Sequence, residues 1–281
     1  FDDTSVENTE LDTTLNDINY KAEDKITNIL LVGTDARPGE DVSRSDAMMI
    51  LTVDGKNKAL KITSLNRDTY VDIPGHGKEK LTHAYAYGEI DLLIRTIEEN
   101  FKLDIQNYAV VNFFSFMDII DTLGGVEVNV KQGEIAETNK FIRKETYKWS
   151  DSNEPMELIK NPGLQKLNGY QALSFARIRY NDSTMERDRR QSEVIGGIIQ
   201  GLKDLPISKY PELLDTVLPY VKTNMKASEI ISVGTQSLSL LSGGINQLEF
   251  PLANMSTDAN LNGVGYVIKF NEDSLELLHD Y

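Results

Sequence analysis

The sequence predicts an α/β fold, in which short buried strands alternate with amphipathic helices along most of the chain. Two patterns indicate it. Mostly apolar segments at 26–32, with its Ile-Leu-Leu-Val run, and at 48–53 are typical of strands buried on both faces. Apolar residues at helical spacing, such as Ile90, Leu93 and Ile97, indicate helices that bury one stripe against a core. With 281 residues, 40% of them hydrophobic, the chain can bury one large core.

Composition limits the possible partners. Residues 1–25 carry eight acidic side chains and two lysines, which predicts a solvated leader or linker before a single domain over 26–281. The formal net charge is −15, so the chain on average repels nucleic acid and anionic membrane surfaces. Cysteine is absent, which excludes disulfides, thiol nucleophiles and thiolate metal sites. No apolar run reaches 18 residues, and the chain opens at Phe1, so we expect any membrane anchor to lie upstream.

The first three strands are expected to form an antiparallel meander. The connection 36–45 is too short for the crossover that a parallel neighbour requires. A tight turn at 54–57 then leads into a third strand at 59–65. The end of strand one, the start of strand two and the end of strand three would therefore share one edge. That edge would gather the following charged residues: Asp35, Arg44, Asp46, Arg67 and Asp68.

Asp35 and Asp46 are candidate metal ligands. Two carboxylates at one strand edge repel each other unless a cation lies between them, and hard oxygen ligands suit Mg²⁺. The alternative is that strand ends are polar in every protein, with no metal involved.

The middle of the chain predicts a strand at 108–113, a short helix at 114–123 and a strand at 125–130. The aromatic cluster around Phe113 and Phe116 is either plain core or the lining of an apolar pocket. His83 is either a base or a hydrogen-bonded structural residue. Residues 131–160 are polar, contain the only tryptophan and lack a clear period, so we expect an excursion over the sheet.

An arginine-rich stretch at 172–202 holds five of the ten arginines. On a helix starting near residue 185, Arg187, Arg190 and Gln191 share a stripe that continues into apolar positions. Arginines that face the interior need an anion, and their guanidinium forks suit phosphate and carboxylate oxygens. Arg177 and Arg179 would leave an extended backbone on one side. The alternative is ion pairing with the protein's own carboxylates.

The last part predicts helices at 211–222 and 226–241, strands at 247–252 and 265–270 around a Ser/Asn-rich loop, and a helix at 273–278. The common nucleotide-binding and hydrolase motifs are absent.

Six ordered motifs carry a resemblance to a known family: N-I-L-L-V-G-T-D-A-R, R-S-D-A-M, S-L-N-R-D-T-Y-V-D-I-P, K-L-T-H-A-Y-A-Y-G, N-P-G-L-Q-K-L-N-G-Y-Q-A-L-S-F-A-R-I-R-Y and R-D-R-R-Q. Over 26–205 the chain resembles the LytR-CpsA-Psr family. The resemblance implies a central mixed sheet packed between helices, with an apolar lipid pocket. It implies a membrane-anchored, extracellular transferase of mostly Gram-positive bacteria. Such an enzyme moves a glycan phosphate from a polyprenyl-pyrophosphate carrier to a peptidoglycan sugar hydroxyl, attaching teichoic acid or capsule to the cell wall.

The resemblance also implies roles for particular residues. Asp35 and Asp46 would hold Mg²⁺ or Mn²⁺. Asp46 or Asp68 would act as the base, with Arg67 and Arg190 also catalytic. The substrate-binding residues would be Arg44, Arg67, Lys80, Arg177, Arg179, Arg187, Arg190 and Gln191. Glu186 departs from the family, in which Gly often precedes the first arginine of R-x-x-R-Q.

Phosphoryl transfer depends mostly on positioning and charge neutralisation, which clustered arginines and a metal supply. Three other readings remain open. A non-catalytic polyprenyl-phosphate carrier or sensor would use the same residues, and a pyrophosphatase would replace the sugar hydroxyl with water. A nucleic-acid-binding regulator is disfavoured by the net charge and by the inward arginines.

Overall fold

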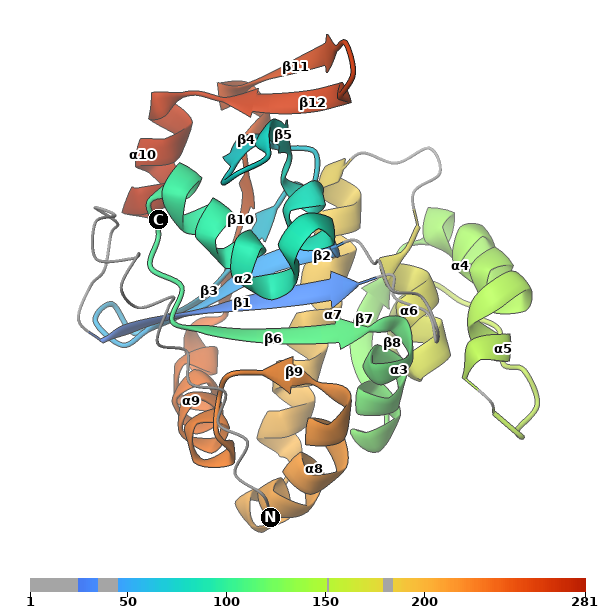
Figure 1. The fold of residues 1–281 in the computed structure, drawn as a ribbon. Helices are drawn as coiled ribbons and strands as arrows, with labels where there is room; N and C mark the ends of the chain where they lie inside the picture. The colour runs from blue at the N-terminus through green and yellow to red at the C-terminus, as the bar shows by residue number, and fades with distance from the viewer. Residues whose placement is uncertain (1–24, 35–44, 151, 179–183) are drawn as a thin grey trace.

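The computed structural model describes residues 25–34, 45–150, 152–178 and 184–281. A six-stranded sheet with the order β10-β3-β2-β1-β6-β9 lies at its centre (Figure 1). Its strands are β1 (Ile26–Thr34), β2 (Ser45–Asp54), β3 (Ala59–Leu65), β6 (Asn107–Asn112), β9 (Lys222–Thr223) and β10 (Ile245–Phe250). The pairs β1–β2 and β2–β3 are antiparallel, which confirms the predicted meander. β6 joins β1 and β10 joins β3 in parallel, so the sheet is mixed.

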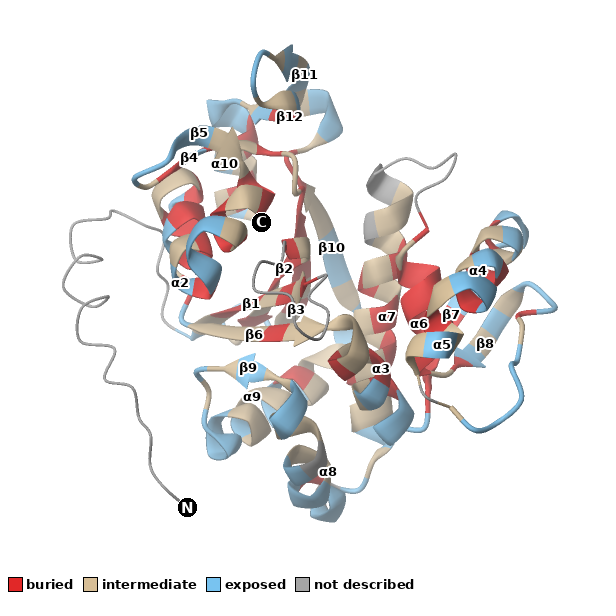
Figure 2. Ribbon diagram, turned by 45° about the vertical axis from the view of Figure 1, so that its right-hand side comes forward, coloured by how far each residue is buried: buried red, intermediate tan, exposed pale blue. Residues whose placement is uncertain are grey.

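Helices cover both faces of this sheet. α2 (Leu81–Phe101) and α10 (Glu272–Asp280) lie on one side, with α7 (Thr184–Asp204) and α9 (Ala227–Leu240) on the other (Figure 1). Because side chains alternate along a strand, Leu30 and Ile50 enter the core under α2, whereas Leu31 and Met49 face α7. Figure 2 shows the buried residues gathered along the central strands and on α6, while α8 carries several exposed residues.

A smaller layer extends from the α7 side. It consists of α3 (Phe113–Thr122), β7 (Val126–Val130), β8 (Gly163–Leu167), α6 (Gly169–Ala176) and α8 (Tyr210–Val217). α7 approaches β7 closely at Gly197, where an added Cβ would lie 2.8 Å from the carbonyl oxygen of Glu127. A side chain there would force the two elements apart, so the glycine fixes how α7 sits on this layer.

The expectation of an irregular excursion at 131–160 is wrong for its first half. Residues 132–149 form η1 (Gln132–Glu134), α4 (Ile135–Phe141), η2 (Ile142–Thr146) and α5 (Tyr147–Trp149), and this segment contacts α6. Its buried face recurs every four residues at Glu134, Thr138, Ile142 and Thr146. Three of these four residues are polar, so the helical stripe is present but cannot be recognised by hydrophobicity.

Three short strands, β4, β5 and β11, were not predicted. β4 (Tyr70–Ile73) pairs with β5 (Gly77–Lys80), and β11 (Ser256–Leu261) pairs with β12 (Gly265–Phe270), which was predicted with its observed bounds. β11 falls in the Ser/Asn-rich segment expected to be a loop. The helix expected at 211–222 ends at Val217, because Pro219 follows and the chain turns through η4 (Leu218–Tyr220) into β9. The remaining 3₁₀ turns are η3 (Ile207–Lys209), η5 (Leu241–Gly243) and η6 (Ala253–Met255).

Of the helices within the described ranges, none combines the length and the apolar character that crossing a membrane requires.

Candidate functional site

A cavity of about 340 Å³ opens between the α7 face of the sheet and the helices α3, α6 and α7. Small residues create the space, since Gly33, Ala47, Ala109 and Ala176 all line it where larger side chains would fill it. The apolar walls come from the sheet and from the helices: Leu31, Met49, Leu51, Val111, Phe113, Phe116, Ile119, Leu173, Ile195, Ile198, Ile199, Leu202 and Val221.

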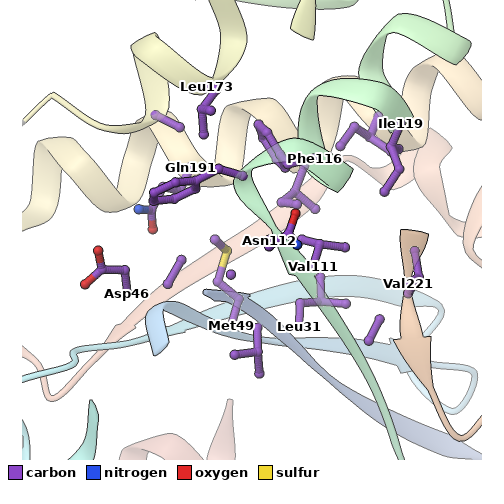
Figure 3. Close-up of a pocket in the computed structure, with 18 of the residues that line it drawn as sticks. Leu31, Asp46, Met49, Val111, Asn112, Phe116, Ile119, Leu173, Gln191 and Val221 are labelled. Carbon is purple, nitrogen blue, oxygen red and sulfur yellow. The ribbon is translucent and has the colours of Figure 1, made fainter. Parts of the chain in front are cut away.

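Few polar side chains line this cavity, and one of them, Asn112, lies in its middle (Figure 3). Figure 3 shows Asp46 and Gln191 at one end, with Ile119 and Val221 at the other. Arg177 and Arg187 also line it. A chamber with mostly apolar walls and a few cationic and hydrogen-bonding groups in its lining suits an amphiphile with an anionic head and a hydrocarbon tail.

A second cavity of about 190 Å³ continues the apolar space. It shares Ile119, Ile198 and Leu202 with the first cavity, and is otherwise lined by residues of α8 and α9 together with Leu123. The two volumes together give a tail more room than the first chamber alone provides.

Charged residues meet at the predicted strand edge. The Nη1 atom of Arg67 donates to Asp46 Oδ1 at 2.6 Å, and its Nε lies 3.7 Å from Asp68 Oδ2. Lys80 Nζ donates to the other Asp68 oxygen at 2.9 Å. The turn after β3 holds this arrangement, because Asn66 accepts from the Asp68 backbone N–H. The predicted convergence is therefore confirmed for Asp46, Arg67 and Asp68, and Lys80 joins them through Asp68.

Asp35, Arg44 and Arg179 were also predicted for this site, and they lie outside the described residues. Their roles stay predictions.

Arg177 projects from the C-terminal end of α6. Its backbone has helical angles (φ −97°, ψ −1°), so the expected extended backbone is wrong at this residue. The guanidinium donates to Glu145 Oε2 at 2.8 Å and lies 4.5 Å from the ring centre of Phe113 and 5.0 Å from that of Trp149. Arg177 thus reaches the cavity as one member of an ionic and aromatic cluster.

The predicted stripe on α7 divides between two surroundings. Arg187 and Gln191 line the cavity, whereas Arg190 is only 1% exposed and donates to Glu134 Oε1 at 3.2 Å and to the carbonyl of Ile178 at 2.9 Å. For Arg190 the structure therefore favours ion pairing with the protein's own carboxylate, which was the alternative. A ligand-binding or catalytic role for Arg190 stays a prediction.

Several residues around the site were not singled out from the sequence. Glu134 accepts from both Arg189 and Arg190, and Arg189 also contacts Glu186 and Glu193. No motif marked Glu134, because it lies in the polar stretch whose helical period was hidden. Glu186 also pairs with Lys131 at 2.7 Å, so the residue that departs from the family pattern ties α7 to the segment after β7.

His83 hydrogen-bonds Glu79 at 2.8 Å on the β5–α2 connection and does not line either cavity, which favours its structural reading.

The predicted metal site depends on the oxygen donors that the cavity offers. Within the described ranges, no group of three or more His, Cys, Asp or Glu side chains could hold a metal ion. Asp46, however, places a carboxylate at the polar end of the cavity. Mg²⁺ is commonly held by one or two carboxylates together with substrate phosphates, and this donor chemistry fits that mode.

Together, the mixed sheet and a mostly apolar chamber with arginines in its lining define an α/β protein whose cavity suits an amphiphile with an anionic head. A family model described as the LytR_cpsA_psr family matches residues 2–279. The chain therefore belongs to this family, which confirms the resemblance noted in its motifs.

Individual relatives agree with this assignment. The "Polyisoprenyl-teichoic acid--peptidoglycan teichoic acid transferase TagT" of Bacillus subtilis (strain 168) is 37% identical over 210 residues, which cover 73% of this chain and 62% of that protein. The corresponding transferase TagU of Bacillus mycoides (strain KBAB4) is 35% identical over 209 residues, with the same coverage. The chain thus spans less than two thirds of the length of these curated relatives.

Solved structures match over more of the chain. "TagT bound to LI-WTA" superposes with a TM-score of 0.73 at 30% identity, covering 92% of this chain and 91% of that one. A structure of the same protein with bound octaprenyl pyrophosphate lipid gives a TM-score of 0.70 at 28% identity, covering 92% and 90%.

Proposed function

We propose that this protein transfers a glycan phosphate from a polyprenyl-pyrophosphate-linked precursor to a peptidoglycan sugar hydroxyl, attaching teichoic acid, capsule or a similar polymer to the cell wall. The observation that carries the proposal is the cavity, whose walls are mostly apolar and whose lining includes Arg177, Arg187, Gln191 and Asp46. The names of the relatives support it, since they are teichoic acid transferases, and one related structure holds a polyprenyl pyrophosphate.

Different residues of the cavity bind the tail and the head group of the substrate. The polyprenyl tail lies along the apolar walls, where each buried methylene contributes roughly 0.8 kcal/mol. The pyrophosphate lies at the mouth, where Arg177 and Arg187 neutralise its charge and orient it through their planar forks. Arg67 adds a third cation at the strand edge. Its Nε is buried and has no hydrogen-bond acceptor among the described residues, so the group is suited to a ligand oxygen.

The reaction needs a group that accepts the proton of the attacking sugar hydroxyl. Asp46 and Asp68 are the candidates, because both carboxylates lie at the same edge and are held in place by Arg67. Lys80 also holds Asp68, whereas Asp46 lines the cavity itself. This geometry favours Asp46 as the group closer to the phosphate.

A divalent cation belongs to this proposal. Asp46, and Asp35 by the sequence prediction, would hold Mg²⁺ or Mn²⁺. Such an ion neutralises charge on the pyrophosphate oxygens when it is bound.

The place of action is also part of the proposal. A polyprenyl carrier and a peptidoglycan acceptor meet at the outer face of the cell membrane. We therefore propose that the protein works there in a Gram-positive bacterium, anchored through a segment that is not in this sequence.

The test is transfer of a labelled glycan from its polyprenyl pyrophosphate to isolated peptidoglycan, with and without a chelator. Asp46→Asn should abolish transfer while the protein keeps its melting temperature. Asp72→Asn serves as the matched control, because Asp72 is exposed on β4 and lines neither cavity. Release of the glycan phosphate into water would show a pyrophosphatase, and retention of the lipid without turnover would show a carrier or sensor. Full transfer in the chelator would remove the metal from the mechanism.

A further inference from the structure

Arg177 is held by groups that no motif of the sequence marked. Its guanidinium contacts Glu145 of η2 at 2.8 Å and lies over three aromatic rings, at 4.5 Å from Phe113, 5.0 Å from Trp149 and 5.3 Å from Phe141. The rings of Phe113 and Trp149 are nearly parallel, with 7° between their planes. One cation at the mouth of the cavity is therefore bound by a carboxylate and an aromatic platform.

The two kinds of contact differ in how easily they can be exchanged. The side chain of Arg177 is 23% exposed and that of Glu145 is 36% exposed. An ion pair this open to water contributes little, because solvent screens both charges. The aromatic contacts do not compete with a ligand for the hydrogen-bonding edge of the guanidinium, since they act on its flat face.

We propose that Glu145 is an internal counter-ion that holds Arg177 when the head group is absent and releases it to the pyrophosphate when the lipid binds. The aromatic platform of Phe113, Phe141 and Trp149 keeps the guanidinium at the mouth throughout this exchange. A pyrophosphate carries more negative charge than one carboxylate and presents several acceptor oxygens, so it outcompetes Glu145 for the same nitrogen atoms. The inference rests on the proposed function, because it assigns a positioning residue to the same head-group site.

The position of Glu145 makes it a competitor of the substrate rather than a catalytic residue. It lies on the helical segment 132–149, and it does not line the cavity, whereas Arg177 does. Removing its charge should therefore strengthen head-group binding. A residue that only supported Arg177 would have the opposite effect, since its loss would let the guanidinium leave the site.

Trp149 supplies a direct signal for this exchange, because it is the only tryptophan in the chain. The probes are farnesyl pyrophosphate and the neutral alcohol farnesol, each titrated into the whole protein by tryptophan fluorescence and by calorimetry. In the wild type, farnesyl pyrophosphate should change the Trp149 emission at the concentration at which calorimetry shows binding. Farnesol should leave the emission nearly unchanged.

Glu145→Gln removes the charge at nearly constant shape and should bind farnesyl pyrophosphate about two- to fivefold more tightly. Glu145→Ala should change affinity in the same direction, because the charge is lost in both variants. Glu137→Gln is the matched control. Glu137 lies on α4 of the same segment and pairs with Lys140, and its substitution should leave the affinity at the wild-type value.

Equal or weaker binding of the pyrophosphate by Glu145→Gln would overturn the inference. So would an unchanged Trp149 emission while calorimetry shows binding, since the anion that pairs with Arg177 beside Trp149 would then not have been exchanged. If calorimetry detects no binding of farnesyl pyrophosphate to the wild type, the lipid site itself fails, and this inference fails with it. The first two results leave the lipid site in place, so the two failures are distinguishable.

Discussion

Replacing Arg190 by alanine separates the two surroundings that the arginines of α7 occupy. Arg190 is 1% exposed, and its partner Glu134 has a side chain that is 9% exposed. Removing Arg190 leaves the buried Glu134 with one cation, Arg189, in place of two, and takes away hydrogen bonds of a charged group, each worth about 1.5–3 kcal/mol of unfolding free energy. For a domain of this size, a loss of about 3 kcal/mol corresponds to a fall of roughly 6–12 °C in the melting temperature.

Arg187→Ala is the comparison. Arg187 lines the cavity three residues earlier on the same helix, so its loss should change the melting temperature little. It should instead reduce the preference for a polyprenyl pyrophosphate over a neutral prenol of equal length, since one charge-assisted contact is worth about 1.5–3 kcal/mol. Arg190→Ala should lower the melting temperature and keep that preference.

The assay is thermal unfolding of the wild type and both variants, with no ligand, with the pyrophosphate and with the prenol. A ligand present at a hundred times its dissociation constant adds about 2.7 kcal/mol, which is large enough to measure. The reasoning is refuted if Arg190→Ala melts like the wild type and loses the preference for pyrophosphate. Arg190 would then reach the ligand, as the sequence predicted.

Two further predictions concern the fold and the tail site. Glu98 is 2% exposed, and burial raises its pKa to about 7, while the hydrogen bond that it accepts from the backbone N–H of Ile105 acts in the opposite direction. Between pH 4.5, the usual pKa of a glutamate, and pH 7, the folded protein therefore keeps a proton on Glu98 that the unfolded chain releases. The contribution of Glu98 to the unfolding free energy is complete below pH 4.5 and is lost as the pH rises to 7. The loss is on the order of 3 kcal/mol, and urea unfolding should show Glu98→Gln with a flatter profile between pH 5 and pH 8; identical profiles would contradict this. Ile198→Trp narrows the passage between the two cavities, so it should weaken the binding of octaprenyl pyrophosphate by about fivefold or more and leave the binding of farnesyl pyrophosphate unchanged. Equal losses of affinity for both lipids would show that the second cavity does not receive the tail.

The sequence was most informative where local chemistry decides the structure. The turn at 54–57 and the short connection at 36–45 required antiparallel neighbours, and the observed register pairs Thr34 with Ser45 at the edge where the charges meet. The strand β3 was predicted with its observed bounds, because Gly55 and Asn57 mark its start and Asn66 follows its end. The meeting of Asp46 with Arg67 followed from that topology.

Other features depend on contacts between distant segments. Arg187, Arg190 and Gln191 form a stripe on one side of α7. The sequence of the helix alone cannot show which of these residues line the cavity and which contact the segment after β7. The partner of Arg190 was hidden for the same reason as α4, since Glu134 belongs to a buried helical face made mostly of polar residues. Glu145 and Trp149 approach Arg177 only because the segment 132–149 packs beside α6.

The arginines of the site show why ligand binding and internal ion pairing are not exclusive readings. Arg67 and Arg177 each pair with a carboxylate, Asp46 and Glu145, yet all four side chains remain between 23% and 36% exposed. Pairs of this kind are worth at most about 1 kcal/mol, so a pyrophosphate that gains about 1.5–3 kcal/mol from each charge-assisted contact can replace the protein's own anion. The buried pair formed by Arg190 differs, because Arg190 is only 1% exposed and a ligand could reach it only by displacing packed protein. Under the proposed function, solvent exposure therefore decides which arginines can exchange a carboxylate of the protein for a pyrophosphate. The same carboxylates neutralise these arginines while no ligand is bound.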